Sequence, residues 1–336
     1  MTAASPPFGV LVSNLGTPEL PTRRAVRRFL AAFLADPRVV ELPRWLWLPV
    51  LYGVILPLRP RRAVHAYQSI WTEAGSPLLA LSQRQAVCLQ EWLEVRLQTT
   101  VPVALGMRYG QPSIGAGLEL LRARGVRCLI VLPLYPQYSA VTTASTFDAV
   151  AAVLRRWRVV PALHMVNGYH DDPGYIDAVA GSIAAAWSER APAQRLLFSF
   201  HGLPERSHRQ GDPYADQCRA TARLIAQQLR LGATRWALAF QSRVGPREWL
   251  KPYTDEQLST WARQGVVSVD TVCPGFSADC LETLEEMALR NRDLFLRCGG
   301  QTFHYIAALN ATPGHIQALG SLVLRHAGGW TEPTRG

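Results

Sequence analysis

Apolar and polar positions follow one another in blocks along the chain: short apolar runs end in turn residues, and each is followed by a segment with helical spacing. The runs are Phe8–Val12, Val101–Leu105, Cys128–Leu132, Leu196–Phe200, Trp236–Phe240 and Val266–Val272. Runs of this length predict strands, and strands that alternate with helices favour a parallel sheet. The pattern therefore predicts an α/β fold.

The segments at the ends of these runs form three pairs of similar sequence, with one member of each pair in each half of the chain. The paired segments are "SNLGTP" at 13–18 and "SFHGLP" at 199–204, "ALGMRYGQP" at 104–112 and "ALAFQSRVGP" at 237–246, and "YPQYSAVTT" at 135–143 and "CPGFSADCLE" at 273–282. All three matches come in the same order. We therefore predict two similar halves, residues 1–165 and 166–336, each a parallel sheet flanked by helices, with a C-terminal helix in the second.

The first two of these segments lie some 50 residues farther apart in the first half than in the second. We therefore predict an insertion in the first half, at about residues 37–80. It contains the apolar run Trp45–Leu58, which has 14 residues and is followed by Pro60, Arg61 and Arg62. A membrane span needs about 20 residues, so the run is too short to cross a bilayer. It predicts the lip of a cleft or a membrane-facing flap.

A binding cleft is expected between the two halves. Ligands of open α/β sheets bind beyond the carboxyl ends of the strands. Polar and aromatic residues gather at these positions: Asn14, Arg108, Tyr109, Tyr135, Tyr138, His201, Gln241, Arg243 and Phe276. We expect them to line the cleft.

Charge and cysteine content narrow the classes of function. The formal net charge of +10 over 336 residues favours an anionic partner. The arginines occur in separated pairs, so we expect no nucleic acid among the partners. No glycine-rich phosphate loop is present, and the six cysteines form no C-x-x-C pair. Without a signal-peptide pattern, we expect a cytoplasmic protein that also associates with a membrane through the apolar run.

His201 directly follows the strand predicted at Leu196–Phe200. Asp279, Glu282, Glu286 and Asp293 fall at i, i+3, i+7 and i+14, along one face of a predicted helix. An imidazole with several carboxylates suits a site that accepts protons or handles a divalent cation transiently. The alternatives are a structural histidine and a solvated acidic helix face.

A set of longer motifs resembles one known family, the ferrochelatases, which insert ferrous iron into a porphyrin. The motifs are "LLFSFHGLPERSHRQGDPY" at 196–214, "NLGTP" at 14–18, "GSPL" at 75–78, "GMRYGQP" at 106–112, "LPLYPQYS" at 132–139, "QSRVGPREWLKPYTDE" at 241–256, "FSADCLETLEE" at 276–286 and "ALNATP" at 308–313. The resemblance covers nearly the whole chain and implies a chelatase fold with two Rossmann-like halves.

The resemblance also implies roles for individual residues. His201 matches the family's catalytic histidine, which takes pyrrole protons or ligates iron, and Glu282 matches the carboxylate that faces it. Asp279 and Glu286 match a path for protons or metal. The residues that match the porphyrin pocket or its propionate contacts are Ser76, Arg108, Tyr109, Trp249, Phe276 and Arg59.

Two departures from the family pattern bear on cofactors and mechanism. Animal ferrochelatases carry an iron–sulfur cluster with one ligand after "YPQYS", where this chain has Ala140. We therefore expect no cluster and no tightly bound cofactor, with ferrous iron as a substrate. Cys280 stands where many relatives have a histidine, which argues against any mechanism that needs a second imidazole there.

The sequence leads us to expect insertion of iron into protoporphyrin IX. Two further readings stay open: a related chelatase, acting on coproporphyrin III or inserting cobalt into a sirohydrochlorin-like ring, and a non-catalytic tetrapyrrole carrier. A carrier needs neither a base nor a proton path, so the presence of both His201 and Glu282 favours an enzyme.

Overall fold

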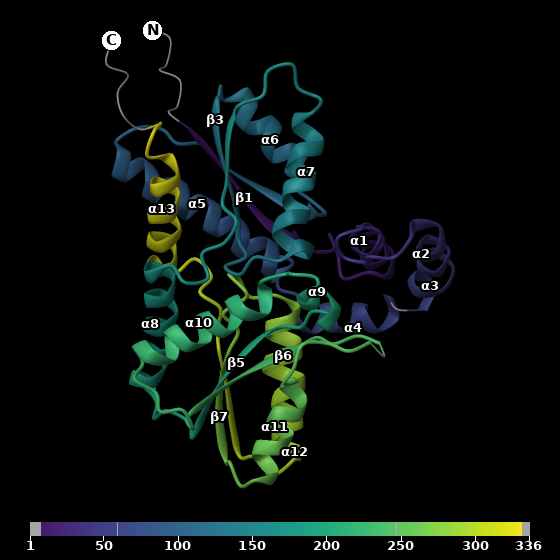
Figure 1. Ribbon diagram of the computed structural model, residues 1–336, viewed down its shortest axis with the longest axis vertical. Coiled ribbons are helices and arrows are strands. Elements are labelled where there is room, and N and C mark those ends of the chain that lie inside the picture. The colour runs from purple at the N-terminus through teal and green to yellow at the C-terminus, as the bar shows by residue number, and fades with distance from the viewer. Residues whose placement is uncertain (1–7, 59, 246, 331–336) are drawn as a thin grey trace. The chain divides into compact units, whose positions relative to one another are not determined.

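A computed structural model describes residues 8–58, 60–245 and 247–330 of the chain (Figure 1). Contacts divide the chain into two compact units. The first comprises Met1–Leu134, Ala140–Gly168 and Ile316–Gly336, and the second comprises Tyr135–Ser139 and Tyr169–His315.

The first unit is built on a four-stranded parallel sheet of order β2-β1-β3-β4. Its strands are β1 (Gly9–Gly16), β2 (Val103–Tyr109), β3 (Cys128–Pro133) and β4 (Ala162–Met165). Its helices are α1 (Arg23–Leu34), α2 (Arg44–Val50), η1 (Leu51–Ile55), α3 (Leu56–Leu58), α4 (Pro60–Ile70), α5 (Pro77–Leu97), α6 (Ile114–Ala123), η2 (Ala140–Ala144) and α7 (Ser145–Leu154), where η denotes a π-helix.

The second unit repeats this arrangement, with a parallel sheet of order β6-β5-β7-β8. Its strands are β5 (Arg195–His201), β6 (Trp236–Gln241), β7 (Ser268–Val272) and β8 (Thr302–Ile306). Its helices are α8 (Pro173–Glu189), α9 (Glu205–Arg209), α10 (Tyr214–Gln228), α11 (Thr254–Arg263), η3 (Glu282–Asn291) and α12 (Arg292–Arg297). Helix α13 (Pro313–Ala327) starts in the second unit and ends in the first.

The predicted α/β class and the two similar parallel sheets are confirmed. Each of the six predicted strands is present, and β4 and β8 are additional strands at the sheet edges. One hydrophobic cluster of the second unit lies between the sheet and the helices α11, η3 and α12, which lie together in Figure 1. The boundary predicted at 165/166 and the cleft between the halves stay predictions.

The predicted insertion consists of α2, η1, α3 and α4, which follow α1. Pro49 lies inside α2 and lacks the N–H that an α-helix uses in its hydrogen bonds, and the apolar run continues directly as the π-helix η1 and the short α3. No helix within the described ranges is long and apolar enough to cross a membrane. Trp45 is 76% exposed and Leu58 is 70% exposed, whereas Trp47 donates its indole N–H to Leu34 O at 2.7 Å.

His315, in the first turn of α13, is fully buried. Its Nδ1 lies 2.7 Å from Asn310 O, and a carbonyl only accepts, so Nδ1 carries the proton. Its Nε2 has no hydrogen-bond partner among the described residues. Burial lowers the pKa of His315 to about 4, which keeps the ring neutral near pH 7.

Acidification is therefore expected to destabilise the protein through His315. Between pH 6.5 and pH 4 the unfolded chain binds a proton that the folded chain does not, so stability falls as the pH falls, by up to about 3 kcal/mol. His315→Asn keeps a donor at the δ position and removes this titration. Urea unfolding at pH 7 and pH 4 should show a smaller acid-induced loss in the variant, and equal losses would contradict the assignment.

Candidate functional site

His201 is the last residue of β5, and its imidazole is half-buried. Its Nδ1 lies 2.7 Å from Gly202 O, so Nδ1 carries the proton and the lone pair of the neutral ring lies on Nε2. Phe276 lies beside the ring, with 6.4 Å between the ring centroids. The local geometry leaves Nε2 to accept a proton or bind a cation.

Gly202 follows His201 because the neighbouring strand leaves no room for a side chain. Its N–H donates to Gln241 O at 2.7 Å. A Cβ at this position would lie 2.7 Å from that same oxygen and 3.3 Å from the ring of Trp249. Trp249 is half-buried and donates its indole N–H to Val244 O at 3.1 Å. Trp249, a predicted pocket residue, therefore lies next to Gly202, the residue that follows the histidine.

Gln241 connects the end of β6 to the first residue of η3. Its buried amide accepts from Ser199 Oγ at 2.6 Å and donates to Glu282 O at 2.7 Å. Because His201 pairs with Gln241 in the sheet, Glu282 is separated from His201 by a single bridging residue. The structure therefore places the two predicted catalytic residues in one part of the second unit.

The helix that carries Glu282 differs from the sequence prediction. Residues Glu282–Asn291 form a π-helix, in which hydrogen bonds run from i to i+5, so the α-helical spacing of the acidic face is wrong here. Asp279 precedes the helix, and Asp293 lies on α12, where its exposed carboxylate is 3.6 Å from Arg292. The four acidic residues do not form one stripe.

Asp279 and Glu286 both accept several hydrogen bonds. Asp279 is 6% exposed and accepts from Thr283 Oγ1, Tyr305 OH and the N–H of Ala308 on one oxygen. Glu286 accepts from the N–H of Ser242 at 2.9 Å and from its hydroxyl at 2.5 Å. Their predicted role as a proton or metal path stays a prediction.

Cys280, between Asp279 and the π-helix, is buried. Burial raises the pKa of Cys280 well above its ordinary value. The charge of the Glu282 carboxylate and its hydrogen bond with the thiol raise this pKa further. The thiol stays protonated near neutral pH and cannot act as a base.

In the first unit, Arg108 and Tyr109 lie at the end of β2 and are fixed by Asp36, which the sequence analysis did not single out. Asp36 Oδ2 accepts from Arg108 Nη2 at 2.5 Å, and from Tyr109 OH and Ser145 Oγ at 2.7 Å each. Burial raises the pKa of Asp36, but the bonds from Ser145, Tyr109 and the Arg38 N–H and the charge of Arg108 outweigh it, and the pKa lies below its ordinary value.

The other predicted pocket residues have different surroundings. Ser76 is 3% exposed and donates to Thr17 Oγ1 at 2.8 Å. Arg108 also donates through Nε to Ser145 O at 2.9 Å and to Ser145 Oγ at 2.7 Å. Arg59 lies outside the described residues.

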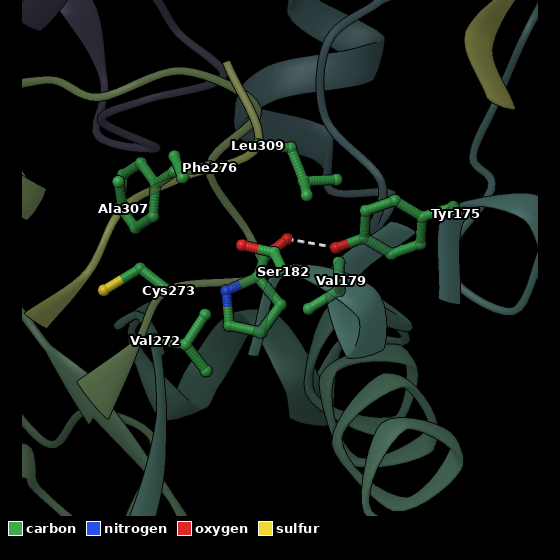
Figure 2. Close-up of a pocket in the computed structure, with 10 residues that line it drawn as sticks. Tyr175, Val179, Ser182, Val272, Cys273, Phe276, Ala307 and Leu309 are labelled. Carbon is green, nitrogen blue, oxygen red and sulfur yellow. Dashed lines mark hydrogen bonds between the residues drawn. The ribbon is translucent and has the colours of Figure 1, made fainter. Parts of the chain in front are cut away.

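A small hollow lies between α8 and the ends of β7 and β8 (Figure 2). Phe276 and Cys273 line it together with apolar side chains, and Tyr175 donates its hydroxyl to Pro274 O. Burial raises the pKa values of Cys273 and Tyr175 well above the ordinary values of these two groups. The hollow therefore holds no group that takes up a proton near neutral pH.

Comparisons with known proteins agree on one family. The family model described as Ferrochelatase matches residues 7–327. The curated ferrochelatase of Nitrosococcus oceani is 56% identical over 98% of this chain and 89% of its own, and ferrochelatase 1 of Shewanella oneidensis is 50% identical over 98% and 99%. Among solved structures, SirB from Bacillus subtilis with Fe3+ has a TM-score of 0.56 at 12% identity, covering 95% of each chain, which shows a shared fold.

The cluster around Asp36 leads to a stability prediction. Asp36→Asn removes the counter-charge of Arg108 in a buried setting and is expected to lower the free energy of unfolding by about 3 kcal/mol. Asp148→Asn is the matched control, because the pair that Asp148 forms with Arg38 is exposed and contributes less than about 1 kcal/mol. Urea unfolding of both variants measures the difference, and similar losses would argue against the buried network.

Proposed function

The chain belongs to the ferrochelatase family, and from this we propose that it inserts ferrous iron into protoporphyrin IX to give protohaem, with release of two protons. The enzyme would then be a lyase of haem biosynthesis. The observation that carries the proposal is the local geometry of the second unit: His201 keeps Nε2 as an acceptor, and Gln241 links the end of its strand to Glu282.

The reaction requires that two pyrrole N–H protons leave as Fe2+ enters, so that the doubly charged metal replaces two protons. We propose that His201 Nε2 accepts a pyrrole proton or ligates the incoming iron. The Glu282 carboxylate, anchored through its own carbonyl, stabilises the imidazolium that forms and takes the proton onward. Cys280 stays protonated and takes no part as a base.

The remaining predicted residues would hold the macrocycle. Phe276 lies beside the His201 ring and Trp249 beside Gly202, and both would supply flat apolar surface for the macrocycle. Arg108 and Ser76 would contact the propionates, as would Arg59. Binding energy from these contacts can be used to bend the porphyrin so that its lone pairs face the metal.

Two other functions use the same residues. Coproporphyrin III carries four carboxylates where protoporphyrin IX carries two, so a coproporphyrin enzyme would need further cations. A carrier would bind the ring and leave His201 without a role. We propose protoporphyrin IX because the exposed apolar side chains of the insertion, such as Trp45 and Leu58, suit the more apolar porphyrin.

Anaerobic metal insertion tests this proposal. The purified protein is given ferrous iron with protoporphyrin IX and, in parallel, with coproporphyrin III, and loss of porphyrin fluorescence is followed. We expect faster turnover of protoporphyrin IX, and a fall of at least about a hundredfold in His201→Ala, because the group that accepts the proton is removed.

His201→Ala should still bind the porphyrin, which separates chemistry from binding. A wild-type protein that binds porphyrin tightly without turnover would be a carrier, and faster use of coproporphyrin III would move the enzyme to that substrate. We also propose that no iron–sulfur cluster or other tightly bound cofactor is present, since Ala140 cannot ligate iron. Cluster bands in the visible spectrum of the protein before porphyrin is added would contradict this.

We further propose that the insertion contacts an anionic membrane surface. Large apolar side chains on α2, η1 and α3 are exposed, namely Trp45, Leu46, Val50, Tyr52, Val54 and Leu58. Helix α1 packs against η1 and α3, and its exposed face carries Arg23, Arg24, Arg27 and Arg28. Apolar side chains beside a row of arginines match an interface of acyl chains and anionic headgroups.

Sedimentation with phosphatidylcholine vesicles, with and without phosphatidylglycerol, tests this contact. Binding should require the anionic lipid and weaken as salt is added. Trp45→Glu should lower the partition coefficient by about tenfold or more, since a buried aromatic side chain contributes roughly 1.5–3 kcal/mol. Val159→Glu is the matched control, because Val159 is 77% exposed outside the insertion. Equal effects of the two variants would rule out the insertion as the contact.

A further inference from the structure

Asn310, in the turn between β8 and α13, uses all four of its polar groups within the second unit. Its N–H donates to Ser277 O at 3.0 Å, and its carbonyl accepts from His315 Nδ1 at 2.7 Å. Its side chain donates to Asp279 Oδ2 at 2.8 Å and accepts from the Asp279 N–H at 2.9 Å. Asn310 and Asp279 are therefore joined by two antiparallel hydrogen bonds.

The backbone of Asn310 also favours this residue type. Its φ is +49°, in the left-handed region, which asparagine adopts more readily than most residues other than glycine. His315 holds the carbonyl from the side of α13 and is neutral near pH 7, so this bond persists there. The amide of Asn310 is thus held in one orientation before it meets Asp279.

Asp279 transmits this constraint to the start of the π-helix. Its Oδ1 accepts from Thr283 Oγ1 at 3.0 Å, and Thr283 Oγ1 in turn accepts from the Cys280 N–H at 2.9 Å. Glu282 lies between Cys280 and Thr283 in the direction of the chain. The segment that carries Glu282 is therefore tied to the turn after β8.

The first turn of η3 is held by contacts with neighbouring segments. Leu281, directly before η3, already has a helical backbone and makes no side-chain cap hydrogen bond. On the side of β6, Gln241 holds only the carbonyl of Glu282. The Leu284 N–H donates to Cys280 O at 2.9 Å, so the helical hydrogen bonds begin directly after Asp279. The two bonds between Asn310 and Asp279 are therefore a second support, on the side of β8, for the segment that carries Glu282.

We propose that Asn310 is a positioning residue for Glu282 in metal insertion: through its two bonds with Asp279 it holds the start of η3, and it touches no substrate itself. This inference rests on the proposed function. The competing reading is that Asn310 contributes only to overall stability.

The test variant is Asn310→Gly, because glycine keeps the left-handed backbone and removes only the amide. We expect kcat for iron insertion to fall by about tenfold to a hundredfold, since small displacements of a catalytic group have effects of that size. The Kd for protoporphyrin IX should stay within about twofold, because no porphyrin contact is removed. The pH profile of kcat should shift as Glu282 moves.

The matched control is Trp187→Phe, in the same unit. Trp187 donates its indole N–H at 2.7 Å to Asp270, which is fully buried, so its loss lowers stability away from η3. We expect a lower Tm with an unchanged kcat and pH profile. If Asn310→Gly and Trp187→Phe lose kcat in proportion to their loss of Tm, or if Asn310→Gly keeps its kcat, the positioning role is wrong.

Hydrogen exchange separates this inference from the proposed function. Amides of residues 279–284 should exchange faster in Asn310→Gly and at the wild-type rate in Trp187→Phe, whether or not the protein inserts iron. A wild-type protein without turnover would overturn the proposed function, and unchanged exchange would overturn the positioning role. Should Asn310→Gly fail to fold, Tyr305→Phe removes one bond to Asp279 and should give smaller changes in the same direction.

Discussion

Parallel pairing of β5 with β6 and β7 is the interaction on which the candidate site depends. Because all three strands run in one direction, their carboxyl ends meet at one edge of the sheet, and His201 lies opposite Gln241 there. Strand β7 ends at the same edge, so Cys273 and the start of the segment that leads to η3 also lie there. A catalytic residue at a strand end is held by the whole ladder behind it, which gives it a more fixed position than a loop would.

Polar groups near this edge are paired, and the pairing decides which of them remain available for chemistry. Asp279 accepts hydrogen bonds from Thr283 in η3 and from Asn310 after β8. Glu286 accepts two hydrogen bonds from Ser242, which follows β6. In the first unit, Asp36 takes up one Nη of Arg108 in the same way. An acceptor or donor that is already satisfied in a buried place is costly to free, whereas a group such as His201 Nε2 is open to a ligand without that cost.

The sequence predicted the framework better than the site, for physical reasons that differ between residues. Six strands were visible as continuous apolar runs because both faces of the sheet are covered. The short edge strand β4, "ALHM", alternates exposed and half-buried positions and has no such run. The π-helix was taken for an α-helix, because the two share the same residue preferences and differ by a hydrogen-bond shift that the surrounding packing decides.

Residues whose importance comes from distant partners could not be found by motif or spacing. Asp36 acts on Arg108 over 72 positions of the chain, and Asn310 on Asp279 over 31. A lone aspartate after a helix and an asparagine in a turn are common and carry no local signal. Strand-end position, acidic spacing and the family resemblance led to His201 and Glu282, but the groups that hold them became visible only from the three-dimensional contacts.

The repeat within the chain shows why the two units can share one topology and differ in chemistry. A Cβ on Gly16 would lie 1.7 Å from Tyr109 O, just as one on Gly202 would lie 2.7 Å from Gln241 O, so both strand ends require glycine against the neighbouring strand. The residue before each glycine is half-buried and free of that constraint. It is Leu15 in the first unit and His201 in the second. The fold thus fixes the glycine and leaves the preceding position open to different residue types, so the two matching strand ends carry a leucine in one unit and an imidazole in the other.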